Sequence, residues 1–176
     1  MDLKEILTSD NILESIDANL DTILDYIPEV RFMIGFDQKH PDHHLDVWHH
    51  TLLALSLSEC DFDIRLVLLL HDIGKPFSYQ EGSIRHYKGH AIKSSEIARI
   101  ILKRLEFDLE FIKHICYLIK MHDNQIKLDL INDNIDLART LYKIQYCDAL
   151  AHHPDKLKKR IEYLNNTKEK ILALRV

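Results

Sequence analysis

Residues 66–76 read Leu-Val-Leu-Leu-Leu-His-Asp-Ile-Gly-Lys-Pro, and this stretch decides the class of fold. The five apolar residues at its start offer no polar face, which is typical of a short helix buried on all sides at the centre of a domain. The glycine and proline that follow favour the end of that helix. His71 and Asp72 therefore lie at the end of a core helix, where both side chains can point at one site.

The rest of the chain also predicts an all-α fold. Glycine and proline, four of each, separate stretches with helical periodicity, and strand and hairpin patterns are scarce. We expect a single-domain helical bundle of about seven helices over residues 1–176. The expected helices are roughly 10–27, 47–58, 64–72, 90–105, 109–122 and 134–151, then one that begins after Pro154, with long loops at 35–46 and 75–89.

Composition limits the possible functions. The chain has 176 residues, of which 46% are hydrophobic and 29% charged, as in a folded globular domain. The net charge of −5 argues against a large nucleic-acid interface. The N-terminus does not resemble a signal peptide, no apolar run is long enough to span a membrane, and the three cysteines are far apart. We therefore expect a cytoplasmic protein; a homodimer is compatible with this composition.

Three of the expected helices carry one polar residue in an otherwise apolar stripe. These residues are His50 in the stripe Val47, Ala54 and Leu57; His122 in the stripe Ile112, Ile115 and Ile119; and Asp148 in the stripe Leu137, Leu141, Ile144 and Ala151. A single buried histidine is more often a hydrogen-bonded core residue than a ligand, and Asp148 could cap a helix or pair with Arg139 or a lysine. Together with His71 and Asp72, however, they favour a shared metal centre inside a bundle. The 12 histidines of the chain are dispersed and fit this interpretation.

An ordered set of motifs resembles the HD-domain phosphohydrolase superfamily. HDIGKP at residues 71–76 is similar to the His-Asp doublet of that family, and MHD and YCDAL follow downstream. QKHPDHHLDVWHHT at 38–51 and RHYKGH at 85–90 look like segments of the HD domains of bacterial tRNA nucleotidyltransferases. The resemblance covers about residues 38–151. No nucleotidyltransferase motif precedes it, so we interpret the chain as a stand-alone HD protein.

The resemblance implies four metal ligands, which are His50, His71, Asp72 and Asp148. His49 competes with His50 for the first position, but the His-Thr motif and the apolar stripe favour His50. Such a mixed set of imidazoles and carboxylates suits Mn, Fe, Ni, Co, Mg or Zn.

Binuclear members of the family have two more histidines between the doublet and the last aspartate. His90 and His122 are the best matches here, whereas His86 and His114 are poorer candidates. The resemblance therefore implies one or two divalent ions.

The implied function is a metal-dependent phosphohydrolase, which uses a metal-activated water on a nucleotide or another small phosphomonoester or phosphodiester. Asp72 is expected to bridge two metals or to orient the water. Lys75 could neutralise a phosphate oxygen, although the helix dipole also favours a lysine at that position. His44, Arg85 and His86 are candidate substrate contacts from the two long loops, where solvated side chains are the other interpretation.

Two other functions remain open from the sequence. One is a regulatory or nucleotide-binding module that does not cleave its ligand. The other is a structural helical domain whose histidines are hydrogen-bonded in the core. The final helix is rich in lysine, but interspersed acidic residues favour a solvated face over a nucleic-acid interface.

Overall fold

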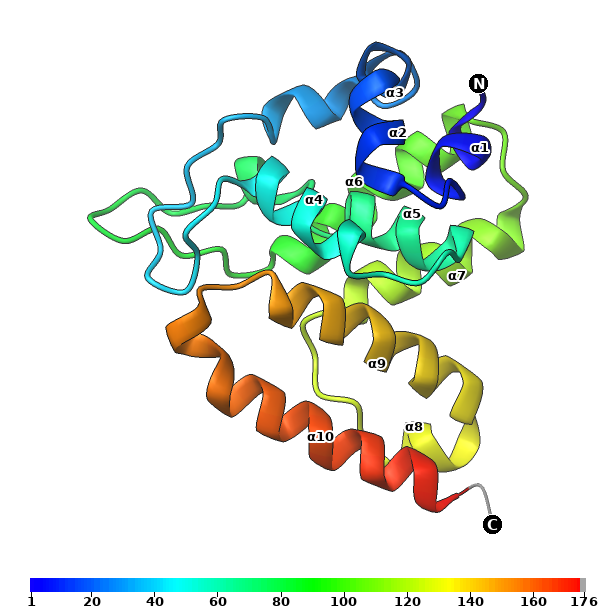
Figure 1. Ribbon diagram of the computed structural model, residues 1–176, viewed down its shortest axis with the longest axis vertical. Helices are drawn as coiled ribbons and strands as arrows, with labels where there is room; N and C mark the ends of the chain where they lie inside the picture. The colour runs from blue at the N-terminus through cyan, green and yellow to red at the C-terminus, as the bar shows by residue number, and fades with distance from the viewer. Residues whose placement is uncertain (175–176) are drawn as a thin grey trace.

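The computed structural model describes residues 1–174 and is all-α, as expected (Figure 1). No β-strand occurs in these residues; one isolated antiparallel bridge joins Gln80 and His86. The helices are α1 Leu3–Leu7, α2 Ile12–Ala18, α3 Leu20–Tyr26, α4 Val47–Ser56, α5 Phe62–Leu70, α6 His90–Arg104, α7 Leu109–Met121, α8 Leu128–Asp133, α9 Ile135–Leu150 and α10 Leu157–Ala173, with 3-10 turns η1 Pro28–Phe32, η2 Lys75–Phe77 and η3 Pro154–Lys156.

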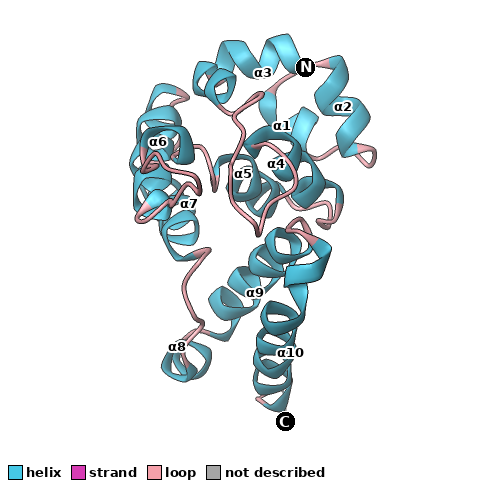
Figure 2. Ribbon diagram, turned by 90° about the vertical axis from the view of Figure 1, so that its left-hand side faces the viewer, coloured by secondary structure: helices cyan, strands magenta, loops and turns pink. Residues whose placement is uncertain are grey.

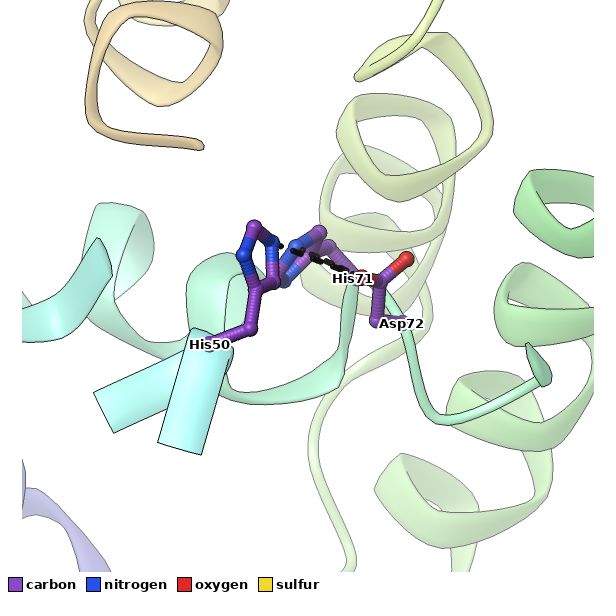
Figure 3. A group of neighbouring side chains, drawn as sticks. All are labelled: His50, His71 and Asp72. Carbon is purple, nitrogen blue, oxygen red and sulfur yellow. Dashed lines mark ion pairs between the residues drawn. The ribbon is translucent and has the colours of Figure 1, made fainter. Parts of the chain in front are cut away.

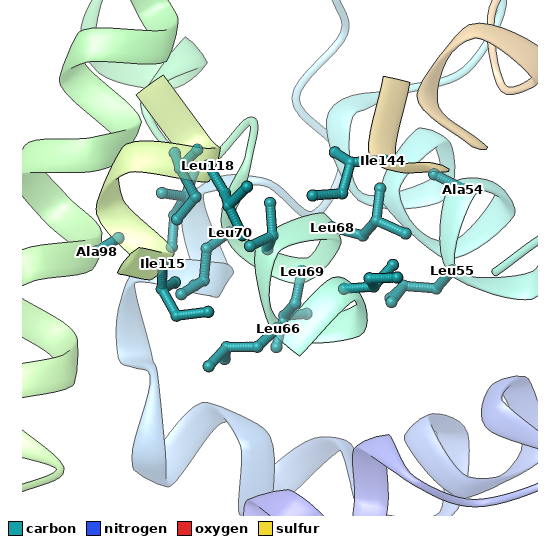
Figure 4. Packing of buried hydrophobic residues seen from close by; sticks show 14 of the residues in the cluster. Ala54, Leu55, Leu66, Leu68, Leu69, Leu70, Ala98, Ile115, Leu118 and Ile144 are labelled. Carbon is teal, nitrogen blue, oxygen red and sulfur yellow. The ribbon is translucent and has the colours of Figure 1, made fainter. Parts of the chain in front are cut away.

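Helix α5 is the central element of the fold. It contacts α1, α4, α6, α7 and α9, and every residue from Ile64 to Leu70 is buried. Figure 4 shows leucines of α5 pointing outward in several directions, toward Leu55 on α4, Ile115 and Leu118 on α7 and Ile144 on α9. Each such side chain contributes about 1.5–3 kcal/mol when it is fully buried. The apolar run therefore anchors the end of α5, where His71 and Asp72 follow.

The other helices surround α5 in groups. Figures 1 and 2 show α1 to α3 on one side and the pair α9 and α10 on the opposite side, while α6 and α7 pack together as a second pair. The long loops at 35–46 and 75–89 lie together at one end, where Arg85 N donates to Lys39 O over 3.0 Å. The ends of α4, α5 and α9 are thus brought under two loops that are far apart in sequence.

The structure differs from the expected helices in three places. The helix expected at 10–27 is interrupted at Asn19, whose side-chain amide donates to Ser15 O over 2.8 Å instead of facing solvent. Helices α1 and α8 were not expected, because five and six residues are too few to display a periodic pattern. Leu57 is 44% exposed because α4 ends at Ser56, so the apolar stripe that contains His50 stops one turn earlier than expected.

Candidate metal centre

Four polar side chains from three elements meet beneath the loops. His50 comes from α4, His71 and Asp72 follow α5, and Asp148 lies in the last turn of α9 (Figure 3 shows the first three). All four are at most 3% exposed. His50 Nε2 lies 3.0 Å from Asp148 Oδ1 and 3.6 Å from Asp72 Oδ2. His71 Nε2 lies 3.3 Å from Asp72 Oδ2 and 3.6 Å from Asp148 Oδ1, so the four tips converge on one point.

Backbone carbonyls orient the two imidazoles. His50 Nδ1 lies 3.1 Å from Ala151 O, and His71 Nδ1 lies 2.6 Å from Leu68 O. A carbonyl only accepts hydrogen bonds, so each Nδ1 atom carries a proton and donates. In the neutral ring the Nε2 lone pair then faces the cluster, which is the usual arrangement of a metal-binding histidine.

A second group shares Asp72. His90, the first residue of α6, and His122, which follows α7, place their Nε2 atoms 3.4 and 4.0 Å from Asp72 Oδ1. The two Nε2 atoms lie 3.3 Å apart, and the Nδ1 atoms face Tyr87 O and Ile119 O. Asp72 therefore presents Oδ2 to one cluster and Oδ1 to the other, as a carboxylate that bridges two cations would.

Gly74 permits this approach of α6. A Cβ atom at Gly74 would lie 2.5 Å from Ser94 N and 2.8 Å from His90 O, both backbone atoms. With no side chain there, Gly74 N donates to Ser94 Oγ over 2.9 Å. The glycine after the His-Asp doublet thus sets the position of His90 relative to Asp72.

The donor atoms of these clusters fit a divalent cation. His71 Nε2 and both carboxylate oxygens of Asp72 are buried without a hydrogen-bond partner, and such atoms are costly in a folded protein. Lys75 Nζ lies 2.7 Å from Asp72 Oδ2, as an ion pair rather than an aligned hydrogen bond. Imidazole nitrogens and carboxylate oxygens at these separations could hold a divalent metal ion.

The ionisation states agree with such a role. Burial raises the pKa of Asp72, but His71 and Lys75 lower it further, to well below its usual value. For Asp148, burial likewise raises the pKa and Arg160 and His152 lower it more. Both carboxylates are therefore anionic at neutral pH.

The pKa values of two imidazoles of the site, His71 and His122, are shifted in opposite directions. Burial lowers the pKa of His71, yet the two neighbouring carboxylates raise it to about 10. Burial and the nearby positive charge of His71 lower the pKa of His122 to about 3. The His122 imidazole is thus neutral at physiological pH, whereas a metal that bound His71 would have to displace a proton.

A cavity of about 240 Å³ opens above Asp72, His90, His122 and Asp148. Lys75 is only 4% exposed, and its Nζ donates to Gln38 Oε1 over 2.8 Å, which fixes the ammonium beside the cavity. The remaining wall is polar and rich in histidine. It comprises His40, Asp42, His43, His86, Tyr87, Asp123, His152 and Arg160.

The structure places two of the four expected substrate contacts in the cavity and two outside it. Lys75 and His86 line the cavity, but His44 and Arg85 do not. His44 is exposed and its ring lies 5.5 Å from that of His153. Arg85 stacks on Phe36 and Tyr79 and donates to Asp37 O and Glu81, so it holds the two loops together.

The competing histidines lie away from the site. His49 is exposed and pairs with Asp46 at the start of α4, and His114 is exposed on α7. Arg139, one alternative partner for Asp148, pairs instead with the exposed Asp136.

The sequence patterns do not predict seven of the side chains that line the cavity, and three of these, His43, His152 and Arg160, are instructive. His43 is adjacent to His44, and nothing in the loop sequence says which of the two points inward. His152 lies four residues after Asp148 and so shares its helical face, a signal that was available. Arg160 belongs to the lysine-rich face of α10, which the sequence predicts to be solvated, yet its Nη2 donates to Asp148 Oδ2 over 2.5 Å.

Comparison with known proteins agrees with this geometry. The HD domain family model matches residues 42–161, and the chain therefore belongs to the HD domain family. The match extends past the expected limit near residue 151 and includes Arg160. Membership implies a domain of the metal-dependent phosphohydrolase type, and the His and Asp groups described above could hold the metal.

Curated relatives are nucleotidyltransferases. The chain is 34% identical over 110 residues to the CC-adding tRNA nucleotidyltransferase of Thermus thermophilus, and 32% identical over 111 residues to the A-adding tRNA nucleotidyltransferase of Deinococcus radiodurans. These matches cover 57% and 58% of this chain but 25% of each relative, so the chain spans about a quarter of their length.

No helix among residues 1–174 is both long and apolar enough to cross a membrane.

Proposed function

We propose that this chain hydrolyses a nucleotide or another small phosphomonoester or phosphodiester, with a divalent metal held by His50, His71, Asp72 and Asp148. One observation carries the proposal. The two oxygens of Asp72 accept no hydrogen bond, although Oδ2 forms an ion pair with Lys75, and they lie on the floor of a cavity whose walls contain the cations Lys75 and Arg160. Anionic ligands below and cationic side chains above are what a metal and a bound phosphate group require together.

A bound divalent ion polarises a phosphoryl oxygen and lowers the pKa of water toward neutrality. Asp72 stays anionic, so with one ion bound its other oxygen can accept a hydrogen bond from an attacking water, and with two ions bound the carboxylate can bridge them. Lys75 is held by Gln38 and places its ammonium where it can balance the negative charge of a phosphate oxygen. We therefore assign Asp72 and Lys75 the central roles among the protein side chains.

We further propose that two ions bind. His90 and His122 complete a second group around the other oxygen of Asp72, and a bridging carboxylate suits two-metal phosphoryl chemistry. His86, together with Tyr87 and His40 on the same wall, offers ring faces and polar atoms for the remainder of a nucleotide.

A small substrate is favoured over a polynucleotide. The relatives are named for tRNA, but this chain has a net charge of −5 and its cavity measures about 240 Å³. An extended nucleic-acid surface would need many more cations than these walls provide.

The assay uses the full chain saturated with Mn, Ni, Co or Mg, and tests nucleotides, cyclic nucleotides and a chromogenic phosphodiester. We expect metal-dependent turnover that Asp72→Asn abolishes and that His114→Ala, a surface change on α7, retains. Circular dichroism checks that both variants are folded. Turnover absent with every metal, or unchanged in Asp72→Asn, contradicts the proposal; tight nucleotide binding without product would instead favour a non-catalytic binding module.

A further inference from the structure

A second hollow adjoins the metal cavity along the first turns of α10. It has a volume of about 320 Å³ and is lined by Asp42, His152, Lys156, Leu157, Lys159 and Arg160. Three of these residues, Asp42, His152 and Arg160, also line the metal cavity. We call this hollow the basic groove. Because the two hollows share a wall, one ligand can occupy both.

The charge of the basic groove is unbalanced. Its three cations, Lys156, Lys159 and Arg160, face one acidic side chain, Asp42. Lys156 and Lys159 are exposed and take part in no ion pair within residues 1–174, although most other charged side chains near the site are paired. The first turn of α10 also contains no acidic residue. Two ammonium groups that line one hollow and take part in no ion pair among the described residues favour an anion.

Arg160 lies at the boundary between the two hollows. Its Nη2 donates to Asp148 Oδ2, a proposed metal ligand, while its Nη1 lies 3.4 Å from His152 Nε2. Asp148 and Asp123 already balance this guanidinium in part, so the free positive charge of the groove belongs to the two lysines.

We infer that the basic groove binds a second phosphate group, and that the substrate carries one phosphate at the metal centre and another beside Lys156 and Lys159. This inference rests on the proposed function for the position of the first phosphate. The second phosphate can belong to a small bisphosphorylated nucleotide or to the next linkage of a short oligonucleotide, and the same side chains would recognise both. The small ligand fits the size of the groove better.

Calorimetry on the full chain saturated with Mn, with the ligands checked for hydrolysis after each titration, compares adenosine 3′,5′-bisphosphate with the 3′- and 5′-monophosphates. We expect the bisphosphate to bind about threefold to tenfold more tightly, as two exposed charge pairs provide. The double variant Lys156→Ala/Lys159→Ala loses this preference and keeps its affinity for the monophosphates. Lys158→Ala, on the same turn but lining a different hollow, is the matched control and keeps the preference.

Three results would overturn the inference: no preference of the unmodified chain for either the bisphosphate or a 5′-phosphorylated trinucleotide over the monophosphates, a preference that survives the double variant, or one that Lys158→Ala removes equally. Thermal unfolding shows whether the variants remain folded, which is expected because all three lysines are exposed. A trinucleotide with a 5′-phosphate forms a second arm. Lysine-dependent binding of the trinucleotide alone would support the groove and assign it to a phosphodiester chain.

The two proposals fail separately. A lysine-dependent preference without turnover on any metal would retain the groove and reject hydrolysis. Turnover of monophosphates without any preference would retain hydrolysis and reject the groove.

Discussion

Arg160, in the second turn of α10, donates a hydrogen bond over 2.5 Å to Asp148, in the last turn of α9. The other oxygen of Asp148 lies 3.0 Å from His50 Nε2. The buried carboxylate is therefore held between a proposed metal ligand and a cation from outside the metal centre. This arrangement ties the pairing of α9 and α10 to the geometry of the site.

Arg160→Ala should destabilise the chain when no metal is present. Asp148 is 3% exposed, and removal of its cationic partner leaves a buried charge that only histidines compensate. We expect a loss of about 1–3 kcal/mol in the free energy of unfolding, measured by urea denaturation in a chelator. Excess Mn should recover part of it. Arg139→Ala, which removes a surface pair with Asp136, should change stability by less than about 1 kcal/mol; equal effects of the two changes would contradict this account.

Gly74→Ala should displace His90. The new Cβ atom would meet the backbone of α6 at 2.5 Å, so the first turn of that helix must shift. We expect a loss of about 1–3 kcal/mol in unfolding free energy and weaker binding of the second metal, while the ion at His50 and His71 is retained. Gly82→Ala is the control. Its new Cβ atom would lie 3.1 Å from Ile84 O, in an exposed loop rather than against a helix. A stable Gly74→Ala variant with full metal content would show that the close approach is not required.

His90→Ala and His122→Ala should each lower the metal content from about two ions per chain to about one, because the pair completes only the group on Asp72 Oδ1. His114 is exposed on α7, the helix that ends just before His122, so His114→Ala should leave the metal content unchanged. Elemental analysis of dialysed protein makes the comparison. A content unaffected by either cavity histidine would argue for a mononuclear centre.

Metal affinity should rise with pH. The Asp72 and Asp148 carboxylates outweigh burial and raise the pKa of His71 to about 10, so a metal displaces one proton below that pH. The apparent affinity is then expected to increase about tenfold per pH unit from pH 6 to 9. His122, with a pKa of about 3, releases none in this range. Calorimetry in two buffers of different ionisation enthalpy counts the protons, and an affinity independent of pH would contradict this ionisation state.

The same shift predicts how stability responds to pH in a chelator. A raised pKa means that the folded state binds the His71 proton more tightly than the unfolded state does, whose value is near 6.5. The resulting stabilisation is complete below about pH 6.5 and is lost as the pH rises toward 10. Urea denaturation across this range should show the decline, and His71→Gln should reduce it.

Much of the fold follows from local patterns. The positions of glycine and proline, together with the apolar periodicity, predict α4 to α7, α9 and α10 to within a few residues. Long helices repeat their apolar face several times, so their pattern is easily recognised. The sequence also predicts the cluster of His50, His71, Asp72 and Asp148. A polar residue in a buried apolar stripe has an energetic cost, so it needs a partner. Whether these four bind metal remains a prediction.

The remainder of the site depends on contacts that no local pattern encodes. Arg160 reaches Asp148 only because η3 turns α10 back along α9. His43 lines the cavity and its neighbour His44 does not. The conformation of their loop is stabilised by Gln38, whose amide donates to Leu45 O over 3.0 Å. Such loop and turn geometry is set by packing between distant segments, and the basic groove therefore became visible only in three dimensions.

The most direct test of the central claim is the metal content of the unmodified chain and of Asp72→Asn after saturation with Mn and exhaustive dialysis. Asp72 is shared by the His50–His71 group and the His90–His122 group, which are proposed to hold the two ions, so a single change should empty both. We predict about two ions per chain in the unmodified protein and nearly none in a folded Asp72→Asn variant. An unmodified chain without stoichiometric metal, or a variant that retains the full content, would contradict the metal centre described here.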